Sequence, residues 1–124
     1  MTLESLYQQI GGNYPDVKAR LVKEERIEKF VLLFLKDSSC SAFVKAMEAG
    51  NVEAAFRAVH TLKGVCMNLG FDALYQIADR ITEQLREADL PHAAQEMPGL
   101  LACYQEHIRM IGAYSDSCAG KDMP

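Results

Sequence analysis

One histidine of this chain, His60, is followed by a lysine three residues later and by a glycine four residues later. On an α-helix, positions three and four apart lie on one face, so an imidazole, an ammonium group and an uncovered stretch of backbone would be presented together. A glycine inside a helix costs about 1 kcal/mol relative to alanine, and close approach by another molecule is one reason to keep it. These residues suit the binding and later release of a phosphoryl group.

The chemistry of imidazole supports this interpretation. Its ordinary pKa is about 6.5, so a neutral ring nitrogen is available as a nucleophile near pH 7. Attack on phosphorus gives a high-energy phosphoramidate, and transfer of this kind depends on positioning and charge neutralisation. Lys63 would neutralise the phosphoryl charge, while its stem can also pack along the edge of a bundle. Taken alone, His60 would be a surface or core histidine without a role, but the spacing of Lys63 and Gly64 favours the functional interpretation.

The sequence His-Thr-Leu-Lys-Gly at residues 60–64, with Leu-Gly at residues 69–70, resembles the signature of histidine-containing phosphotransfer (HPt) domains. The resemblance is specific over residues 60–70 and extends more loosely over residues 17–111. It implies that His60 is the phosphoacceptor, that Lys63 stabilises the phosphoryl charge and that Gly64 gives clearance to a docking partner.

Helical periodicity runs through nearly the whole chain, without the alternating β-branched runs that are typical of strands. The charged residues 23–26 can divide the second helix, and Pro98 with Gly99 kinks or divides the last one. Asn51 and Gly70 are candidate caps of the helix that carries His60. The pattern predicts helices over residues 3–10, 17–36, 41–49, 52–69, 72–88 and 92–114.

Amphipathic helices joined by short loops predict an all-α fold, an antiparallel four-helix bundle of up-down-up-down topology with one or two extra N-terminal helices. The length of 124 residues favours a single domain. We expect the core bundle over about residues 17–114 and a frayed tail over residues 115–124. A helical wheel places His60 at the edge of the buried stripe, in one sector with Lys63, Gly64 and Met67.

The next helix would contribute further residues to the site. By the resemblance, Thr82 and Arg86 flank His60 and touch the partner, although family members often carry an amide where Thr82 stands. Arg86 could bind phosphate or a partner's carboxylate, or it could pair with Glu83 or Glu87 on its own helix. Met67 stands where the family usually has a small residue, so it would either crowd the docking face or give it a flexible apolar contact.

Composition excludes several other classes of protein. The net charge of −4 and the pI near 5.3 disfavour binding to nucleic acid or to an anionic membrane. The longest apolar run, residues 30–35, is too short to span a bilayer, and no signal-peptide pattern is visible, so we expect a cytoplasmic protein with reduced cysteines. Cys103 and His107 are four residues apart, but two ligands do not make a zinc site, and no metal site is predicted.

We therefore expect a histidine phosphotransfer protein that carries a phosphoryl group on His60 between aspartates of response-regulator receiver domains. The resemblance implies these receivers and a hybrid histidine kinase as partners, with any Mg²⁺ held by the receiver and no cofactor in this chain. No phosphate-binding loop or kinase motif is present, so no autonomous ATP-dependent kinase activity is expected. We expect a monomer.

Two alternatives remain. The first is an HPt-like adaptor that docks a receiver without phosphotransfer, which would not need His60. The second is a helical metal-binding or histidine-dependent enzyme, which would need more converging polar residues than the sequence offers.

Overall fold

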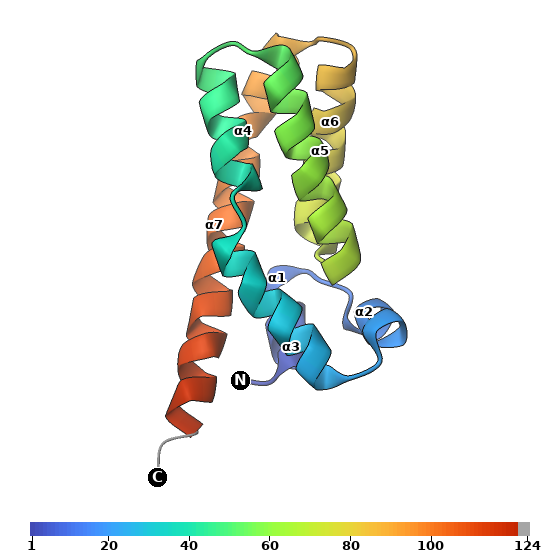
Figure 1. The fold of residues 1–124 in the computed structure, drawn as a ribbon, viewed down its shortest axis with the longest axis vertical. Helices are drawn as coiled ribbons and strands as arrows, with labels where there is room; N and C mark the ends of the chain where they lie inside the picture. The colour runs from blue at the N-terminus through green and yellow to red at the C-terminus, as the bar shows by residue number, and fades with distance from the viewer. Residues whose placement is uncertain (122–124) are drawn as a thin grey trace.

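The computed structural model describes the backbone of residues 1–121 and the side chains of residues 1–118. Within this range the fold is entirely helical, and the predicted all-α class is confirmed (Figure 1). No helix in the described part of the chain is long and apolar enough to cross a membrane. The elements are α1 (Leu3–Ile10), α2 (Tyr14–Leu21), α3 (Glu24–Leu33), the short 3-10 helix η1 (Phe34–Lys36), α4 (Ser39–Glu48), α5 (Val52–Leu69), α6 (Asp72–Arg86) and α7 (Leu90–Lys121).

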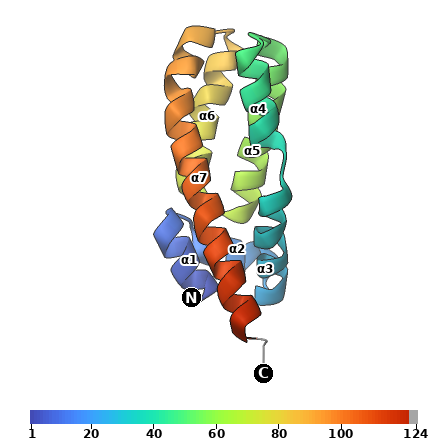
Figure 2. The same ribbon diagram turned by 90° about the vertical axis from the view of Figure 1, so that its left-hand side faces the viewer.

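The last four helices form the bundle. α4, α5, α6 and α7 alternate in direction along the long axis, so the predicted up-down-up-down topology is confirmed (Figures 1 and 2). α3 and η1 lead into α4, which leaves α1 and α2 as the two extra N-terminal helices, and these lie at the end of the bundle where α5 ends (Figure 1).

The predicted helix over residues 17–36 is divided. Val22 has a φ of 66°, and its N–H donates to the carbonyl of Lys18, which ends α2 before α3 begins. Left-handed backbone at a β-branched residue interrupts a helix, because a helix needs consecutive residues in the right-handed region. Of the two possibilities that the charged residues 23–26 left open, the structure therefore has two helices.

α7 runs the length of the molecule and continues through Pro98 (Figure 2). Proline cannot donate to the carbonyl four residues before it, but Pro98 and Ala94 are both exposed, so water can reach this turn. The expected frayed tail over residues 115–124 differs from the structure, since α7 extends to Lys121. Tyr114 is buried and Cys118 packs against the core, which ties this part of α7 down. Residues 122–124 lie outside the described range.

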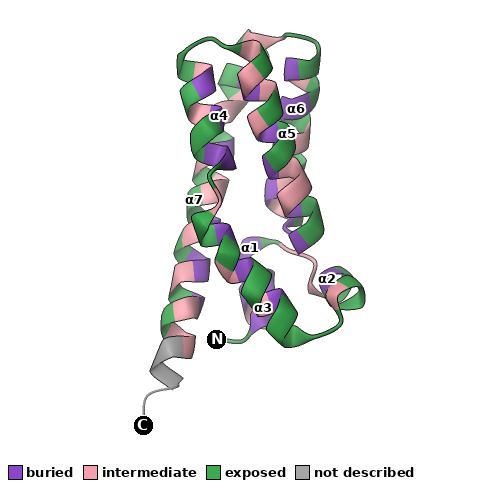
Figure 3. Ribbon diagram, viewed as in Figure 1, coloured by how far each residue is buried: buried purple, intermediate pink, exposed green. Residues whose placement is uncertain are grey.

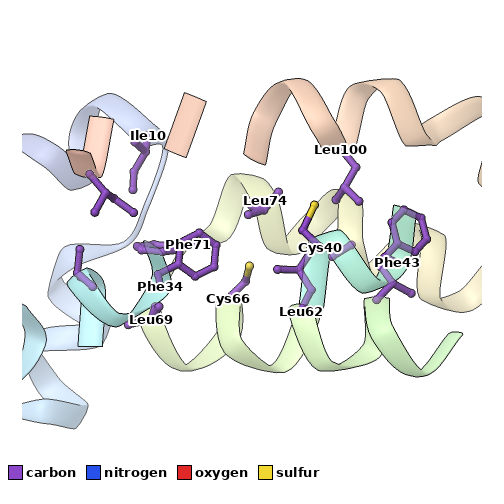
Figure 4. Close-up of a cluster of buried hydrophobic side chains, with 14 of the residues drawn as sticks. Ile10, Phe34, Cys40, Phe43, Leu62, Cys66, Leu69, Phe71, Leu74 and Leu100 are labelled. Carbon is purple, nitrogen blue, oxygen red and sulfur yellow. The ribbon is translucent and has the colours of Figure 1, made fainter. Parts of the chain in front are cut away.

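One continuous hydrophobic core lies between the helices (Figures 3 and 4). Its inner face on α5 is the stripe of buried residues Ala55, Val59, Leu62, Cys66 and Leu69. Where α5 turns into α6, Phe71 packs edge-on against Phe34 with ring centroids 5.2 Å apart. Burying large apolar side chains is the main favourable term in folding, so this cluster fixes how α5 and α6 meet η1.

The C-terminus of α5 is held by the N-terminal segment. The last four carbonyls of a helix have no partner inside the helix and must be satisfied elsewhere. The Tyr7 hydroxyl donates to the carbonyl of Leu69 at 2.7 Å, and Arg20 donates to the carbonyls of Met67 and Asn68 at 2.8 Å each. The remaining one, on Cys66, accepts from the N–H of Phe71 at 2.9 Å. All four carbonyls therefore have donors, and the two donor side chains belong to α1 and α2.

Gly70 makes this contact possible. It has a φ of 70°, the left-handed conformation that ends α5. A Cβ at this position would lie 2.9 Å from the carbonyl oxygen of Asn13, and the N–H of Asn13 donates to the Gly70 carbonyl at 2.7 Å. Both the conformation and the close approach require glycine here.

Replacing Tyr7 with phenylalanine should lower the free energy of unfolding by about 1–3 kcal/mol, because the buried Leu69 carbonyl loses its donor while the ring is kept. Burial raises the pKa of the Tyr7 phenol, so the group stays protonated and able to donate. Urea denaturation measures the change. Tyr14→Phe is the matched control: its hydroxyl bonds Glu24 at an exposed site, and its loss should cost less. Equal losses in the two variants would contradict this account of the α5 terminus.

Candidate functional site

α5 presents the residues that the sequence singled out. It begins after Asn51, whose side-chain oxygen accepts from the N–H of Ala54 at 3.1 Å, and it ends at Gly70, as predicted. Successive residues turn by about 100°, so His60, Lys63, Gly64 and Met67 follow one strip of the helix beside α6. Of these, His60 and Met67 are exposed, while Lys63 and Gly64 are half-buried.

The His60 ring lies flat against a phenylalanine. The ring of Phe56, one turn earlier on α5, is stacked on it with an interplanar angle of 8° and centroids 5.7 Å apart. The guanidinium carbon of Arg86, on α6, lies 5.1 Å from the centroid of the same phenylalanine ring. Phe56 thus contacts both the candidate nucleophile and a candidate phosphate-binding cation, which limits where each side chain can lie.

Both nitrogens of the His60 ring remain available. The histidine hydrogen bonds in the described part of the chain belong to His92 and His107. An exposed imidazole without a competing bond can approach an incoming electrophile with either nitrogen.

Lys63 is engaged by a carboxylate. Its ammonium lies 2.9 Å from Asp79 on α6, and the two side chains are 20% and 41% exposed. The hydrogen bond that the Lys63 ammonium donates to Asp79 is the main cause that raises the pKa of Lys63, so the amine is charged throughout the neutral range. The site therefore holds an ammonium group one helical turn from His60, and a carboxylate is paired with it.

Gly64 leaves open space next to His60. A Cβ built on Gly64 would meet no atom within 4 Å, so packing inside the protein does not require glycine here. Met67, one turn further along, has 53% of its surface exposed and adds an apolar side chain to the same strip. The strip combines a nucleophile, a cation, bare backbone and one flexible hydrophobic group.

The two residues expected from α6 are placed differently from one another. Thr82 is fully buried, and its hydroxyl donates to the carbonyl of Ala78 at 2.6 Å, so it presents nothing to a phosphoryl group or a partner at the surface. The prediction that Thr82 flanks His60 and touches the partner is therefore corrected. A threonine on a helix can donate its hydroxyl to the preceding turn and pack its methyl group inward. Arg86 is exposed and pairs with Glu83, at 3.1 and 3.3 Å.

Asp79 and Phe56 are members of the site that the spacing around His60 did not predict. Phe56 falls in the same helical sector as His60, but an apolar residue four positions away also suits the core. Asp79 shares a face of α6 with Thr82 and Arg86, at spacings of three and seven residues. Only the packing of α5 on α6 shows that it meets Lys63.

The other two histidines lie elsewhere. His92 pairs with Asp89 at 2.6 Å near the start of α7. His107 is buried, and its Nδ1 lies 2.8 Å from the carbonyl of Cys103 as donor. Burial lowers the pKa of His107, which favours the neutral ring. Within the described residues, no group of three or more potential metal ligands is arranged around a common point.

A cavity of about 410 Å³ lies on another side of α5, between this helix, α2 and α3. Its lining includes Phe30, Leu33 and Val65, and neither His60 nor Lys63 borders it. The chemistry-bearing residues therefore lie on an open surface rather than in a pocket, an arrangement that suits a macromolecular partner more than a small substrate.

Replacing Gly64 with alanine should raise the free energy of unfolding by about 0.5–1 kcal/mol, because the added methyl group meets open space and the helix loses its glycine penalty. Urea denaturation with an unchanged slope would measure this. Gly50→Ala is the control, since Gly50 also has open space around it but a φ of 66°, so alanine there should destabilise. A destabilised Gly64→Ala would show that this glycine has a structural role.

Comparison with known proteins agrees with this geometry. A family model described as the Hpt domain matches residues 25–109, well over half of the chain and including all of α5 and α6. Neither the curated proteins nor the solved structures gave a match. The family implies histidine phosphotransfer in two-component signalling. With a four-helix bundle, an exposed histidine on its second helix and a lysine one turn away, this chain belongs to the Hpt domain family.

Proposed function

We propose that this protein is a phosphocarrier that accepts a phosphoryl group on His60 from the aspartyl phosphate of one receiver domain and passes it to the aspartate of another. The observation that carries the proposal is the exposed His60 ring, with Lys63 one turn away and open space above Gly64.

The transfer follows from the chemistry of these groups. A neutral ring nitrogen of His60 donates its lone pair to phosphorus, the bond from phosphorus to the aspartate oxygen breaks, and the carboxylate leaves with the electron pair. The onward step is the reverse, with a different carboxylate as nucleophile. Charge on the phosphoryl oxygens is balanced by Lys63 and Arg86, and such electrostatic balance supplies most of the catalysis in phosphoryl transfer.

The docking surface consists of the exposed strip of α5 around His60, Gly64 and Met67, with Arg86 on α6 beside it. Met67 offers a flexible apolar contact, and Arg86 offers a cation to an acidic partner. Any Mg²⁺ used in the reaction belongs to the receiver in this proposal, because carboxylates are its preferred ligands and the aspartates lie on that side.

His60→Gln should abolish phosphorylation, while His92→Gln should leave it unchanged. The test is incubation with a receiver domain phosphorylated by acetyl phosphate, followed by intact mass and by acid treatment, which cleaves a phosphoramidate. Labelling that survives the loss of His60 would contradict the proposal. A wild-type protein that binds the receiver without becoming labelled would instead support the adaptor function.

Gly64→Gln should slow transfer by about 10- to 100-fold, because a long side chain beside His60 would displace the reacting atoms from their aligned positions. The fold should be retained, because a Cβ at this position meets no atom within 4 Å. Transfer rates and receiver affinity are compared with those of Gly64→Ala, which keeps the clearance. Wild-type transfer by Gly64→Gln would rule out a clearance role.

A further inference from the structure

The ion pair between Lys63 and Asp79 joins the two helices that form the site. In the described part of the chain it is the ion pair that links α5 to α6, and its partners are held at 2.9 Å at the edge of the helix interface. Lys63 is therefore not an unpaired cation. In the protein without a phosphoryl group, its charge is already balanced by a carboxylate.

A phosphoryl group on His60 brings about two negative charges to the same turn of α5. It then competes with Asp79 for the Lys63 ammonium. If Lys63 turns to the phosphoryl group, Asp79 loses its cation and faces a like charge. If Lys63 stays, the phosphoryl group has less positive charge beside it. In both cases the carboxylate makes the phosphorylated state less stable relative to the unphosphorylated one.

This competition matters for a carrier. A site that bound the phosphoryl group with full strength would stabilise the carried state and hinder release, since ground-state stabilisation alone does not speed a reaction. Because the Asp79 carboxylate competes for the Lys63 ammonium, it lowers the stability of the phosphohistidine. The phosphoryl group is then held, but it can move on to an aspartate.

We propose that Asp79 is a positioning residue that holds Lys63 beside His60 in the resting protein and competes for it when His60 is phosphorylated, so that the phosphoryl group is held loosely enough to be passed on. This inference rests on the proposed function. It adds a residue that destabilises the carried state to the residues that stabilise it.

Glu83 would compete for Arg86 in the same way, but more weakly. It pairs with Arg86 within α6, three residues apart, and the two side chains are 55% and 49% exposed. Solvent screens such pairs, and they contribute little. The Lys63–Asp79 pair lies at the junction of two helices with its lysine only 20% exposed, so the competition at Asp79 is the stronger one.

The test measures the equilibrium of phosphorylation and needs no identified partner. Phosphoramidate is the donor: its P–N bond breaks as the bond from His60 to phosphorus forms, and ammonia leaves. The phosphorylated fraction is read by intact mass at a fixed ratio of phosphoramidate to ammonium, approached from both directions. Asp79→Asn, which keeps the shape and removes the charge, should raise the ratio of phosphorylated to free protein roughly two- to fivefold. Asp79→Glu, which restores a carboxylate, should return it toward wild type.

Two comparisons separate the mechanism from a change in overall charge or fold. Glu87→Gln removes one negative charge from an exposed position at the end of α6 and should leave the ratio unchanged. In a Lys63→Ala background, Asp79→Asn should have a much smaller effect, because the residue acts through Lys63. Thermal unfolding checks that each variant is folded, and Asp79→Ser replaces Asp79→Asn if the latter is not.

The inference is overturned if Asp79→Asn has the wild-type ratio, if Glu87→Gln shifts the ratio as much, or if the effect is undiminished without Lys63. A wild-type protein that neither phosphoramidate nor a phosphorylated receiver domain labels at His60 would overturn the proposed function itself. A labelled wild type with an unresponsive Asp79 would overturn the present inference alone.

Discussion

Four backbone carbonyls at the C-terminus of α5 must find donors outside the helix, and the way they do so fixes the helix that carries the site. The N–H of Phe71 satisfies the first of them, and Arg20 and Tyr7 satisfy the other three. The Leu69 carbonyl is at a buried site, and a buried carbonyl without a donor would cost about 1–3 kcal/mol, which favours the placement of this end of α5 against α1. Gly70 lets the chain turn there, and α6 then packs along α5 in the register that brings Asp79 to Lys63.

The site is balanced electrically before any phosphoryl group arrives. Each of its two cations has a carboxylate partner on α6, Lys63 with Asp79 and Arg86 with Glu83. Phe56 adds a neutral element, since its ring contacts both His60 and the guanidinium of Arg86. An open surface whose charges are paired avoids strong nonspecific attraction to anions. The more exposed cation, Arg86, can exchange partners at low cost because solvent screens its ion pair.

Much of this could be predicted from the sequence, because its local signals are strong. The bounds of α1 and α5 follow from apolar periodicity that stops at a glycine, Gly11 and Gly70 respectively. The strip of His60, Lys63, Gly64 and Met67 follows from helical geometry alone. Contacts between helices could not be predicted in the same way. A polar residue on α6 is equally compatible with an exposed position and with a buried one bonded to its own helix. Thr82 has the second arrangement, and Asp79 is set by the packing of α6 on α5.

Differences at the helix ends have a similar origin. Nothing local in the sequence marks Val22 as a residue with positive φ, although its conformation is what ends α2. Continuation of α7 beyond Tyr114 depends on side chains such as Cys118, which pack against core residues that are distant in sequence. Polar composition over residues 115–121 therefore predicted less helix than the structure has there.

The contacts at the end of α5 also bear on where the boundaries of this domain lie. The family match covers residues 25–109, but Tyr7, Asn13 and Arg20 come before it, and the buried side chains of Met110, Ile111 and Tyr114 come after it. A fragment cut to the matched residues would leave carbonyls at the end of α5 without their donors and remove apolar side chains from the core. The packed unit of this protein is thus larger than the region that carries the family's sequence pattern, and the N-terminal segment is part of the scaffold rather than an appendage to it.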